Sequence, residues 1–218
     1  MAPKKNKKRL TPEQRKRKSN RTTWIAIAAI ATVVVVFGIL AASGLLGNRS
    51  DTPMEPIAPT QVLLETTEGN ITIDLRTDKP ITSGNFINLV NEGVYDGTTF
   101  YRTMAEFMIQ GGKGASGGNI PSIKDEIGTN NRNTNYTIAM ANTGAPNSAS
   151  SEFFINVADN GQRISGFNSN YSVFGTVIDG TDVVDAIANA PVTENPSRPG
   201  EQSVPVNPVK ILRATVLP

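Results

Sequence analysis

Two residue types that carry much of enzyme chemistry are missing here: the 218-residue sequence has no cysteine and no histidine. Without cysteine there is no disulfide, no cysteine-bound zinc or iron–sulfur centre and no thiol nucleophile. Without histidine the chain lacks the commonest general base near neutral pH and the commonest metal ligand. A serine hydrolase would need another base, and residues 61–218 contain no Ser-x-x-Lys pattern. We therefore expect a site that works without a metal, a cofactor or a covalent intermediate.

Charged residues are present, but their signs are unevenly distributed. Residues 1–21 hold ten lysines and arginines and one glutamate, a net charge of +9. The remaining chain holds eleven basic and eighteen acidic residues, a net charge of −7. The whole-chain value of +2 therefore describes neither part.

An uncharged run of 23 residues, from Trp24 to Leu46, follows the basic segment. About 20 apolar residues are enough for a helix to cross a bilayer, and a basic flank of this kind stays in the cytoplasm. We expect a single-pass anchor in the cell membrane, with the N-terminus cytoplasmic and the main domain outside. Ala41-Ala42-Ser43 could instead be the cleavage site of a signal peptide, which would release the domain. A buried core helix is least favoured, because a helix apolar on all sides needs a larger protein around it.

These patterns divide the chain into four segments: a basic tail at 1–21, a transmembrane helix at 22–47, a linker at 48–60 with three prolines, and a folded domain at 61–218. Basic tails can bind nucleic acid. Because this basic tail lies next to a predicted membrane span, we favour its interpretation as a topology signal that contacts anionic lipids. We therefore expect a membrane partner through residues 24–46 and no nucleic-acid partner.

The pattern of apolar and turn residues in the domain is typical of a mainly β fold. Phe86, Leu89 and Val90 have helical spacing, with Thr82 or Ser83 as the expected N-cap and Gly93 after the C-terminus. A second helix is expected in the stretch GTDVVDAIANA (180–190), with Thr181 or Asp182 near its start and Val183, Val184 and Ile187 inward. Strands are expected at 62–66, 71–76, 98–103, 106–110, 136–141, 153–157, 172–178 and 207–217, with a hairpin turn at 68–70. Many short strands and two helices favour a closed antiparallel barrel or a sandwich.

The same stretches resemble the cyclophilin-type peptidyl-prolyl isomerases over nearly all of residues 61–217. The resemblance rests on NFINLVNEGVYDGTTFYR (85–102), FMIQGG (107–112), IAMANTGAPNSASSEFFINVADN (138–160) and YSVFGTVIDGTDVVDAI (171–187). It implies a closed eight-stranded antiparallel β-barrel with a helix at each end and a shallow groove on its outer face. It also implies isomerisation of Xaa-Pro bonds in proline-containing polypeptides and assistance to protein folding.

Carried over motif by motif, the resemblance assigns the catalytic arginine to Arg102 in FYR. The substrate-binding positions are Phe107, Met108, Gln110, Ala141, Asn142, Thr143, Glu152, Phe154, Phe167 and Tyr171. The segment 141–143 would receive the substrate backbone, and Phe154 would form the proline pocket. Without the resemblance, a strand arginine would usually be a solvated surface group, and Phe107, Met108 and Phe154 would usually be core residues.

These residue types suit rotation about an Xaa-Pro bond. Amide resonance gives this bond a barrier of about 18–20 kcal/mol, and twisting it requires no covalent intermediate. The prolyl nitrogen becomes a hydrogen-bond acceptor in the twisted form, so a permanently charged guanidinium beside it stabilises the transition state selectively. Arg102 can fill this role while Phe107, Met108 and Phe154 hold the ring, and Asn142 and Gln110 fix the substrate backbone and the arginine.

Two departures from the family pattern change the expected properties. Trp24 is the single tryptophan and lies in the apolar run, so the domain lacks the tryptophan with which many cyclophilins bind cyclosporin, and we expect weak binding of that drug. Glu152 stands where the family usually has glutamine, which can donate a hydrogen bond as well as accept one. Glu152 could pair with Arg102, favour basic residues in the substrate, or draw Arg102 away. We expect a mild loss of generic activity.

Two further features of the domain remain open to interpretation. The altered pocket and Glu152 leave room for a non-catalytic module that grips proline-containing segments. A short domain with a surface groove favours a monomer.

Overall fold

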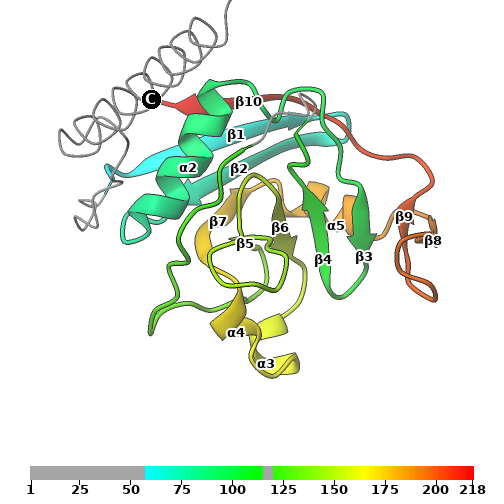
Figure 1. Cartoon of the computed structure of the whole chain (residues 1–218). Coiled ribbons are helices and arrows are strands. Elements are labelled where there is room, and N and C mark those ends of the chain that lie inside the picture. Colours follow the sequence, from blue (N-terminus) through cyan, green and yellow to red (C-terminus); the bar gives the residue numbers. More distant parts are fainter. Residues whose placement is uncertain (1–56, 115–119) are drawn as a thin grey trace, which may run out of the picture. The chain divides into compact units, whose positions relative to one another are not determined.

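The computed structural model describes residues 57–114 and 120–218. They form an eight-stranded antiparallel sheet, a separate hairpin and four helices (Figure 1). The strands of the large sheet are β1 (Thr60–Thr66), β2 (Gly69–Leu75), β3 (Arg102–Met104), β4 (Met108–Gly111), β5 (Thr137–Met140), β6 (Phe153–Asn156), β7 (Val173–Asp179) and β10 (Ile211–Leu217). Each predicted strand is present, with bounds that differ by a few residues. The β1–β2 turn is Thr67-Glu68, one residue earlier than predicted, because Thr66 pairs with Gly69.

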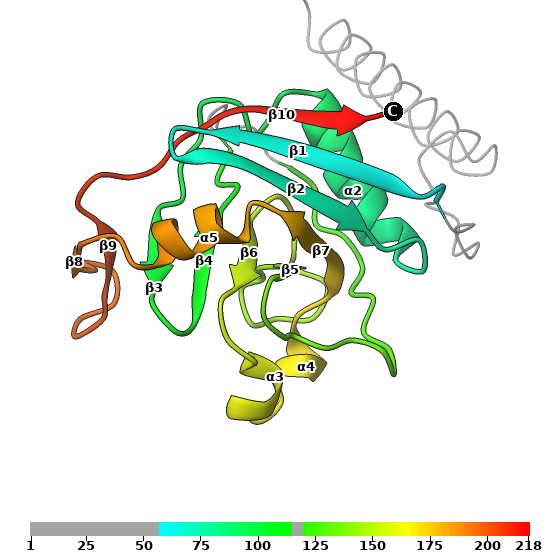
Figure 2. The same cartoon turned by 180° about the vertical axis from the view of Figure 1, so that it is seen from behind.

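The large sheet curls, but its two edge strands do not close it into a barrel (Figure 1, Figure 2). The strand order is β10-β1-β2-β7-β5-β6-β4-β3, so β10 and β3 are the edges. The segments that precede these strands meet at one bridge, Thr99 with Lys210, flanked by backbone hydrogen bonds between residues 97–100 and 209–211. The predicted closed barrel is therefore wrong for the described residues, which form a half-barrel. Strand β3 has only three residues and begins after the chain has passed this bridge, so no ladder to β10 develops.

The concave side of the sheet is filled by a large aromatic and aliphatic core. Phe153 of β6 is fully buried there, and its ring makes edge-on contacts with Phe86, Tyr95 and Phe100 at centroid distances of 5.6, 5.5 and 6.1 Å. Each such contact contributes about 0.5–1.5 kcal/mol beyond the burial of area. This core fixes the curvature on which the opposite face of β4, β5, β6 and β7 depends.

Helix α2 (Pro80–Asn91) packs against β10 and β7. Its apolar residues Phe86, Leu89 and Val90 are buried, as their spacing predicts. The end of the helix is also as predicted: Gly93 has φ +67°, and the amides of Gly93 and Val94 donate to the carbonyls of Val90 and Leu89. This is a Schellman motif.

The start of α2 lies earlier than predicted, because the cap comes from a distant segment. Lys79 is the N-cap residue and Pro80 occupies the first helical position. The Glu126 carboxylate accepts hydrogen bonds from the amide and hydroxyl of Thr82, both at 2.7 Å. With these donors satisfied from outside, neither Thr82 nor Ser83 acts as the cap.

Helix α5 (Thr181–Ala188) packs against β2, β4 and β3, at the other end of the curled sheet from α2 (Figure 1, Figure 2). Its N-cap is Gly180 rather than Thr181 or Asp182. Val184 and Ile187 are buried, whereas Val183 is half-buried. A Cβ at Gly180 would lie 2.0 Å from the carbonyl oxygen of Asn70, and this close approach requires glycine at the start of the helix.

Three elements were not predicted. Two are short helices, α3 (Asn160–Arg163) and α4 (Phe167–Asn170), which follow β6. The third is a hairpin of β8 (Val192–Glu194) and β9 (Gln202–Pro205), inserted between α5 and β10 and in contact with β3. Figure 1 shows this hairpin beside the β3 end of the large sheet.

The predicted membrane span, residues 22–47, lies outside the described residues, as does the basic tail. No helix within residues 57–114 and 120–218 has the length and apolar character needed to cross a membrane. The last residues of the predicted linker are described: Ile57 packs against the core and Thr60 already belongs to β1.

Candidate active site

A second apolar cluster lies on the opposite face of the strands from the core. We call it the outer cluster; its buried members are Met108, Ala139, Phe154, Phe167 and Val173, and Met104, Phe107, Ala141 and Tyr171 pack against it. Successive strand residues point to opposite faces, and this alternation separates the two clusters. In β6, Phe153 and Ile155 face the core while Phe154 faces the outer cluster. The same rule places Ile109 inside and Met108 outside in β4.

Arg102 lies at the edge of the outer cluster, where β3 begins. It pairs with Gln110 in the β3–β4 register. Its Nη1 lies 3.3 Å from Oε1 of Gln110 and 3.8 Å from the sulfur of Met108. The guanidinium carbon is 5.8 Å from the centre of the Phe107 ring. The structure thus brings Arg102, Phe107, Met108 and Gln110 together, as the resemblance implies.

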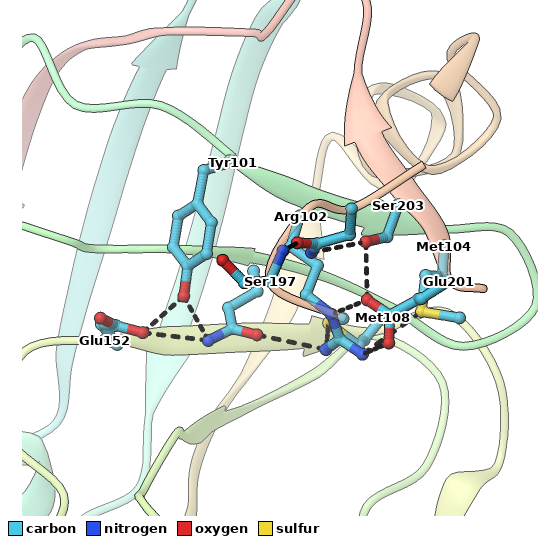
Figure 3. A network of polar contacts seen from close by, with 10 residues as sticks. Tyr101, Arg102, Met104, Met108, Glu152, Ser197, Glu201 and Ser203 are labelled. Carbon is cyan, nitrogen blue, oxygen red and sulfur yellow. Dashed lines mark hydrogen bonds and ion pairs between the residues drawn. The ribbon is translucent and has the colours of Figure 1, made fainter. Parts of the chain in front are cut away.

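A residue that sequence reasoning missed holds the other side of the guanidinium. Glu201, in the β8–β9 connection, accepts hydrogen bonds from Nε and Nη2 of Arg102 at 2.6 and 2.7 Å (Figure 3). The side chains of Arg102 and Glu201 are 13% and 19% exposed, so this ion pair is largely shielded from water. The hydrogen bond from Arg102 lowers the pKa of Glu201 to about 2, and a bond from Ser203 acts in the same direction. The carboxylate is therefore ionised throughout the physiological range.

Glu152 does not contact Arg102. Its carboxylate accepts hydrogen bonds from the hydroxyl of Tyr101 at 2.5 Å and from Nε2 of Gln110 at 3.0 Å. Burial, and then this hydrogen bond, raise the pKa of Tyr101, which therefore stays protonated as a donor. Because Gln110 donates through Nε2 to Glu152, its Oε1 is turned toward Arg102. The two ideas that Glu152 holds Arg102 or draws it away are thus both wrong for this structure.

The segment 141–143 forms one border of the outer cluster. Ala141 donates its amide to the carbonyl of Glu152 at 2.9 Å, and the Asn142 side chain donates to the carbonyl of Asn170 at 2.7 Å. Within the described part of the chain, the backbone N–H and C=O of Asn142 make no hydrogen bond. They are available to a bound peptide backbone. Thr143 is exposed, and its amide bonds to the hydroxyl of Ser148.

Phe167 and Tyr171 lie at the far side of the outer cluster, positioned by α4. Their ring centres are 4.7 Å apart, and those of Phe154 and Tyr171 are 5.3 Å apart. Phe167 also approaches Phe107 at 5.9 Å. Of the predicted site residues, six belong to the outer cluster or pack against it: Phe107, Met108, Ala141, Phe154, Phe167 and Tyr171. Arg102 and Gln110 contact each other at its edge, and Asn142 contacts the carbonyl of Asn170. Thr143 is exposed, and Glu152 is linked to Arg102 through Gln110.

The glycine pair of FMIQGG positions this face. A Cβ at Gly112, which has φ +78°, would lie 2.6 Å from the carbonyl oxygen of Ser151 and 2.7 Å from the Phe153 ring. Only glycine lets the end of β4 approach β6 this closely. Among residues 57–114 and 120–218, no three acidic side chains gather in a way that could hold a metal ion.

The arrangement offers a fixed cation beside an apolar surface, with peptide-binding groups on one border. Such a site can bind an apolar ring and stabilise electron density that develops next to it, without covalent chemistry.

Comparison with known proteins agrees with this geometry. Residues 61–216 match the family described as cyclophilin type peptidyl-prolyl cis-trans isomerase/CLD. A peptidyl-prolyl cis-trans isomerase of Acinetobacter baylyi is 43% identical over 166 residues, which cover 73% of this chain and 87% of that protein. Another from Streptomyces antibioticus is 42% identical over 167 residues, 72% of this chain and 98% of that protein. Peptidyl-prolyl cis-trans isomerase A of Dickeya dadantii is 38% identical over 198 residues, 86% of this chain and 96% of that protein.

Solved structures share the fold. A cyclophilin-type isomerase of Cryptosporidium parvum superposes with a TM-score of 0.64 at 24% identity, over 74% of this chain and 99% of that chain. A structure of the same protein in the presence of the dipeptide Ala-Pro gives a TM-score of 0.62 at 25% identity, over 72% of this chain and 99% of that chain. The family match and the identities to these relatives show that this chain belongs to the cyclophilin-type peptidyl-prolyl cis-trans isomerases.

Proposed function

We propose that the chain isomerises Xaa-Pro bonds in unfolded or partly folded polypeptides outside the cytoplasmic membrane, and so assists their folding. The observation that supports this most strongly is the placement of the Arg102 guanidinium between Gln110 and the outer cluster. The structure of the Cryptosporidium parvum isomerase in the presence of the dipeptide Ala-Pro also supports a proline-containing substrate.

In this proposal Arg102 acts on the twisted peptide bond. The uncatalysed reaction takes about 10–100 s at 25 °C, because the planar amide loses its resonance as it rotates. The lone pair of the prolyl nitrogen then accepts a hydrogen bond that the planar amide cannot accept. Arg102 donates to this nitrogen, or to the prolyl carbonyl, and so binds the transition state better than either ground state.

The remaining groups hold the substrate so that only one side of the bond rotates. Phe107, Met108 and Phe154 would hold the pyrrolidine ring against the outer cluster. The free backbone groups of Asn142 would bind the peptide backbone. Because the ring side is held while the preceding residue rotates, the reacting bond stays close to the guanidinium throughout the rotation.

The location rests on the sequence outside the described residues. The net charge of +9 in residues 1–21 and the uncharged run 24–46 support a membrane anchor with the domain on the far side of the membrane. The absence of cysteine allows a direct test. Ser50→Cys and, as a matched control, Ser19→Cys would be exposed in intact cells to a membrane-impermeant maleimide. Labelling of Ser50→Cys alone supports the proposal; labelling of Ser19→Cys in intact cells contradicts it, and a shortened product would show cleavage.

The activity is tested by exchange NMR spectroscopy on an Ala-Pro peptide. Residues 54–218 form one compact unit that includes the whole family match at residues 61–216, so this fragment is suitable. We expect faster cis–trans exchange with the wild-type fragment and a loss of about a hundredfold in Arg102→Ala. Peptide resonances that shift without faster exchange would instead indicate a proline-binding module without catalysis.

A further inference from the structure

The partner of the catalytic arginine belongs to an element outside the large sheet. Glu201 is separated from Arg102 by 99 residues and reaches it from the β8–β9 connection. The two oxygens of its carboxylate meet Nε and Nη2 in a parallel fork. This fork is the strongest and most directional geometry available to an arginine and a carboxylate.

Hydrogen bonds within the hairpin and its connection hold the Glu201 carboxylate in position, in addition to its bonds with Arg102. The hydroxyl of Ser203, which is fully buried, donates to Oε1 of Glu201 at 2.6 Å. The side chain of Asn195 donates to that hydroxyl at 3.1 Å, and its Oδ1 accepts from the amide of Ser197 at 3.0 Å. Figure 3 shows a continuous chain of bonds from Ser197 through Ser203 and Glu201 to Arg102 and on to Glu152.

The fork also determines which donors remain for a substrate. Nε is turned toward Glu201, and Nη2 is shared between Glu201 and the sulfur of Met104 at 3.4 Å. Nη1 makes no bond to Glu201 and is turned toward Gln110 and Met108, on the side of the outer cluster. We propose that Glu201 is a positioning residue of the isomerase site, which fixes the guanidinium so that Nη1 faces the bound proline. This inference rests on the proposed function of Arg102.

Glu201 has two opposite effects on catalysis. Its negative charge weakens the field of Arg102 at the substrate, and its hydrogen bonds keep the guanidinium in place. The surroundings favour the second effect. Apart from Gln110 and Glu201, Arg102 contacts the sulfurs of Met104 and Met108 and lies near the Phe107 ring. Without the carboxylate, a charged group among such neighbours is poorly solvated and turns toward water, away from the reacting bond.

The test compares Glu201→Gln and Glu201→Ala with the wild-type fragment in the exchange assay. We expect kcat to fall about tenfold in both variants with little change in KM, because the arginine is displaced and the apolar surface is kept. In NMR spectra, the Nε–Hε signal of Arg102 should be sharp and shifted downfield in the wild type, and should lose this shift in both variants. Acetate should restore part of the rate of Glu201→Ala, and equal chloride should not.

Glu194→Ala is the matched control from the same hairpin. Glu194 accepts a hydrogen bond from the Gly200 amide at 2.9 Å and does not contact Arg102. Wild-type kcat in Glu194→Ala supports the proposal; an equal loss there would show that hairpin integrity is what matters and would overturn it.

Unchanged or increased kcat in the Glu201 variants would also overturn it. If the wild-type fragment itself does not accelerate exchange, the proposed function is wrong, and the positioning role that rests on it is wrong as well. Thermal unfolding of each variant shows whether it is folded, and the acetate response is read only from folded protein.

Discussion

Arg102 and Gln110 are direct partners in the β3–β4 register, and Nη1 of the arginine lies 3.3 Å from Oε1 of the glutamine. This backbone pairing places the two residues directly opposite each other, so the sheet brings their side chains within reach of one another. Gln110 is in turn oriented by Tyr101 and Glu152. The candidate catalytic group is therefore held by the sheet on one side and by the β8–β9 hairpin on the other.

Glu152→Gln should leave kcat/KM unchanged or raise it by up to about threefold. The carboxylate acts on Arg102 only through Gln110, and its replacement removes a negative charge near the site while keeping an acceptor for Tyr101. Exchange spectroscopy on the Ala-Pro peptide measures the change. A clear decrease would show that the glutamate helps catalysis and would contradict our expectation of a mild loss caused by Glu152.

The Arg102–Glu201 pair should make stability depend on pH in acid. The pKa of Glu201 is depressed in the folded state, from an ordinary 4.5 to about 2. The stabilisation is therefore fully present above pH 4.5 and is lost as the pH falls toward 2.

Denaturant unfolding at several pH values measures this effect. The wild type should be more stable than Glu201→Gln by about 1–2 kcal/mol at pH 7, allowing for screening by solvent. The difference should shrink as the pH approaches 2. A difference that stays constant over this range would show that the charge of Glu201 is not its source.

Phe153 and Phe154 are adjacent in β6 but face opposite sides of the sheet, which gives a paired test of the outer cluster. Phe153→Leu and Phe154→Leu should each lower the free energy of unfolding by roughly 1–2 kcal/mol, because both side chains are buried. Only Phe154→Leu should raise KM for the Ala-Pro peptide. Equal effects of the two substitutions on KM would argue against the outer cluster as the proline-binding surface.

Cyclosporin should bind weakly, with a Kd of about 1 μM or more, or less than about 8 kcal/mol of binding free energy. The reason is that residues 61–218 contain no tryptophan. Inhibition of peptide exchange by increasing cyclosporin measures the affinity, with the unlabelled peptide as a competitor control. Low-nanomolar inhibition would show that the outer cluster replaces the missing ring.

Much of the site could be predicted because its signals are local. The alternation in 107–112 and 153–157 separates the core from the outer cluster, and the resemblance then selects Phe107, Met108 and Phe154. The buried members Ala139 and Val173 were missed, since a small or β-branched residue in a strand gives no sign of the face it lines.

The features that escaped prediction depend on distant contacts. Glu201 lies among prolines and glycines, where a glutamate is usually a solvated surface charge, and nothing local indicates an ion pair with a residue 99 positions away. The start of α2 was misplaced for the same reason, because its cap is Glu126, 44 residues from Thr82. The open edge between β3 and β10 was missed because it depends on where the segments around Thr99 and Lys210, far apart in the sequence, stop pairing.

The β8–β9 hairpin joins α5 to β10 without belonging to the large sheet, yet its Glu201 carboxylate holds the guanidinium of Arg102. Residues 191–206 pair with no strand of the eight-stranded sheet, so a change in this segment acts through its contacts with β3 and Arg102 and not through a strand register. Relatives with the same strands but a different hairpin would inherit the same scaffold with a differently tuned arginine. A chimaera that exchanges only this insert should therefore change the turnover number while the strand pairing of the large sheet is kept.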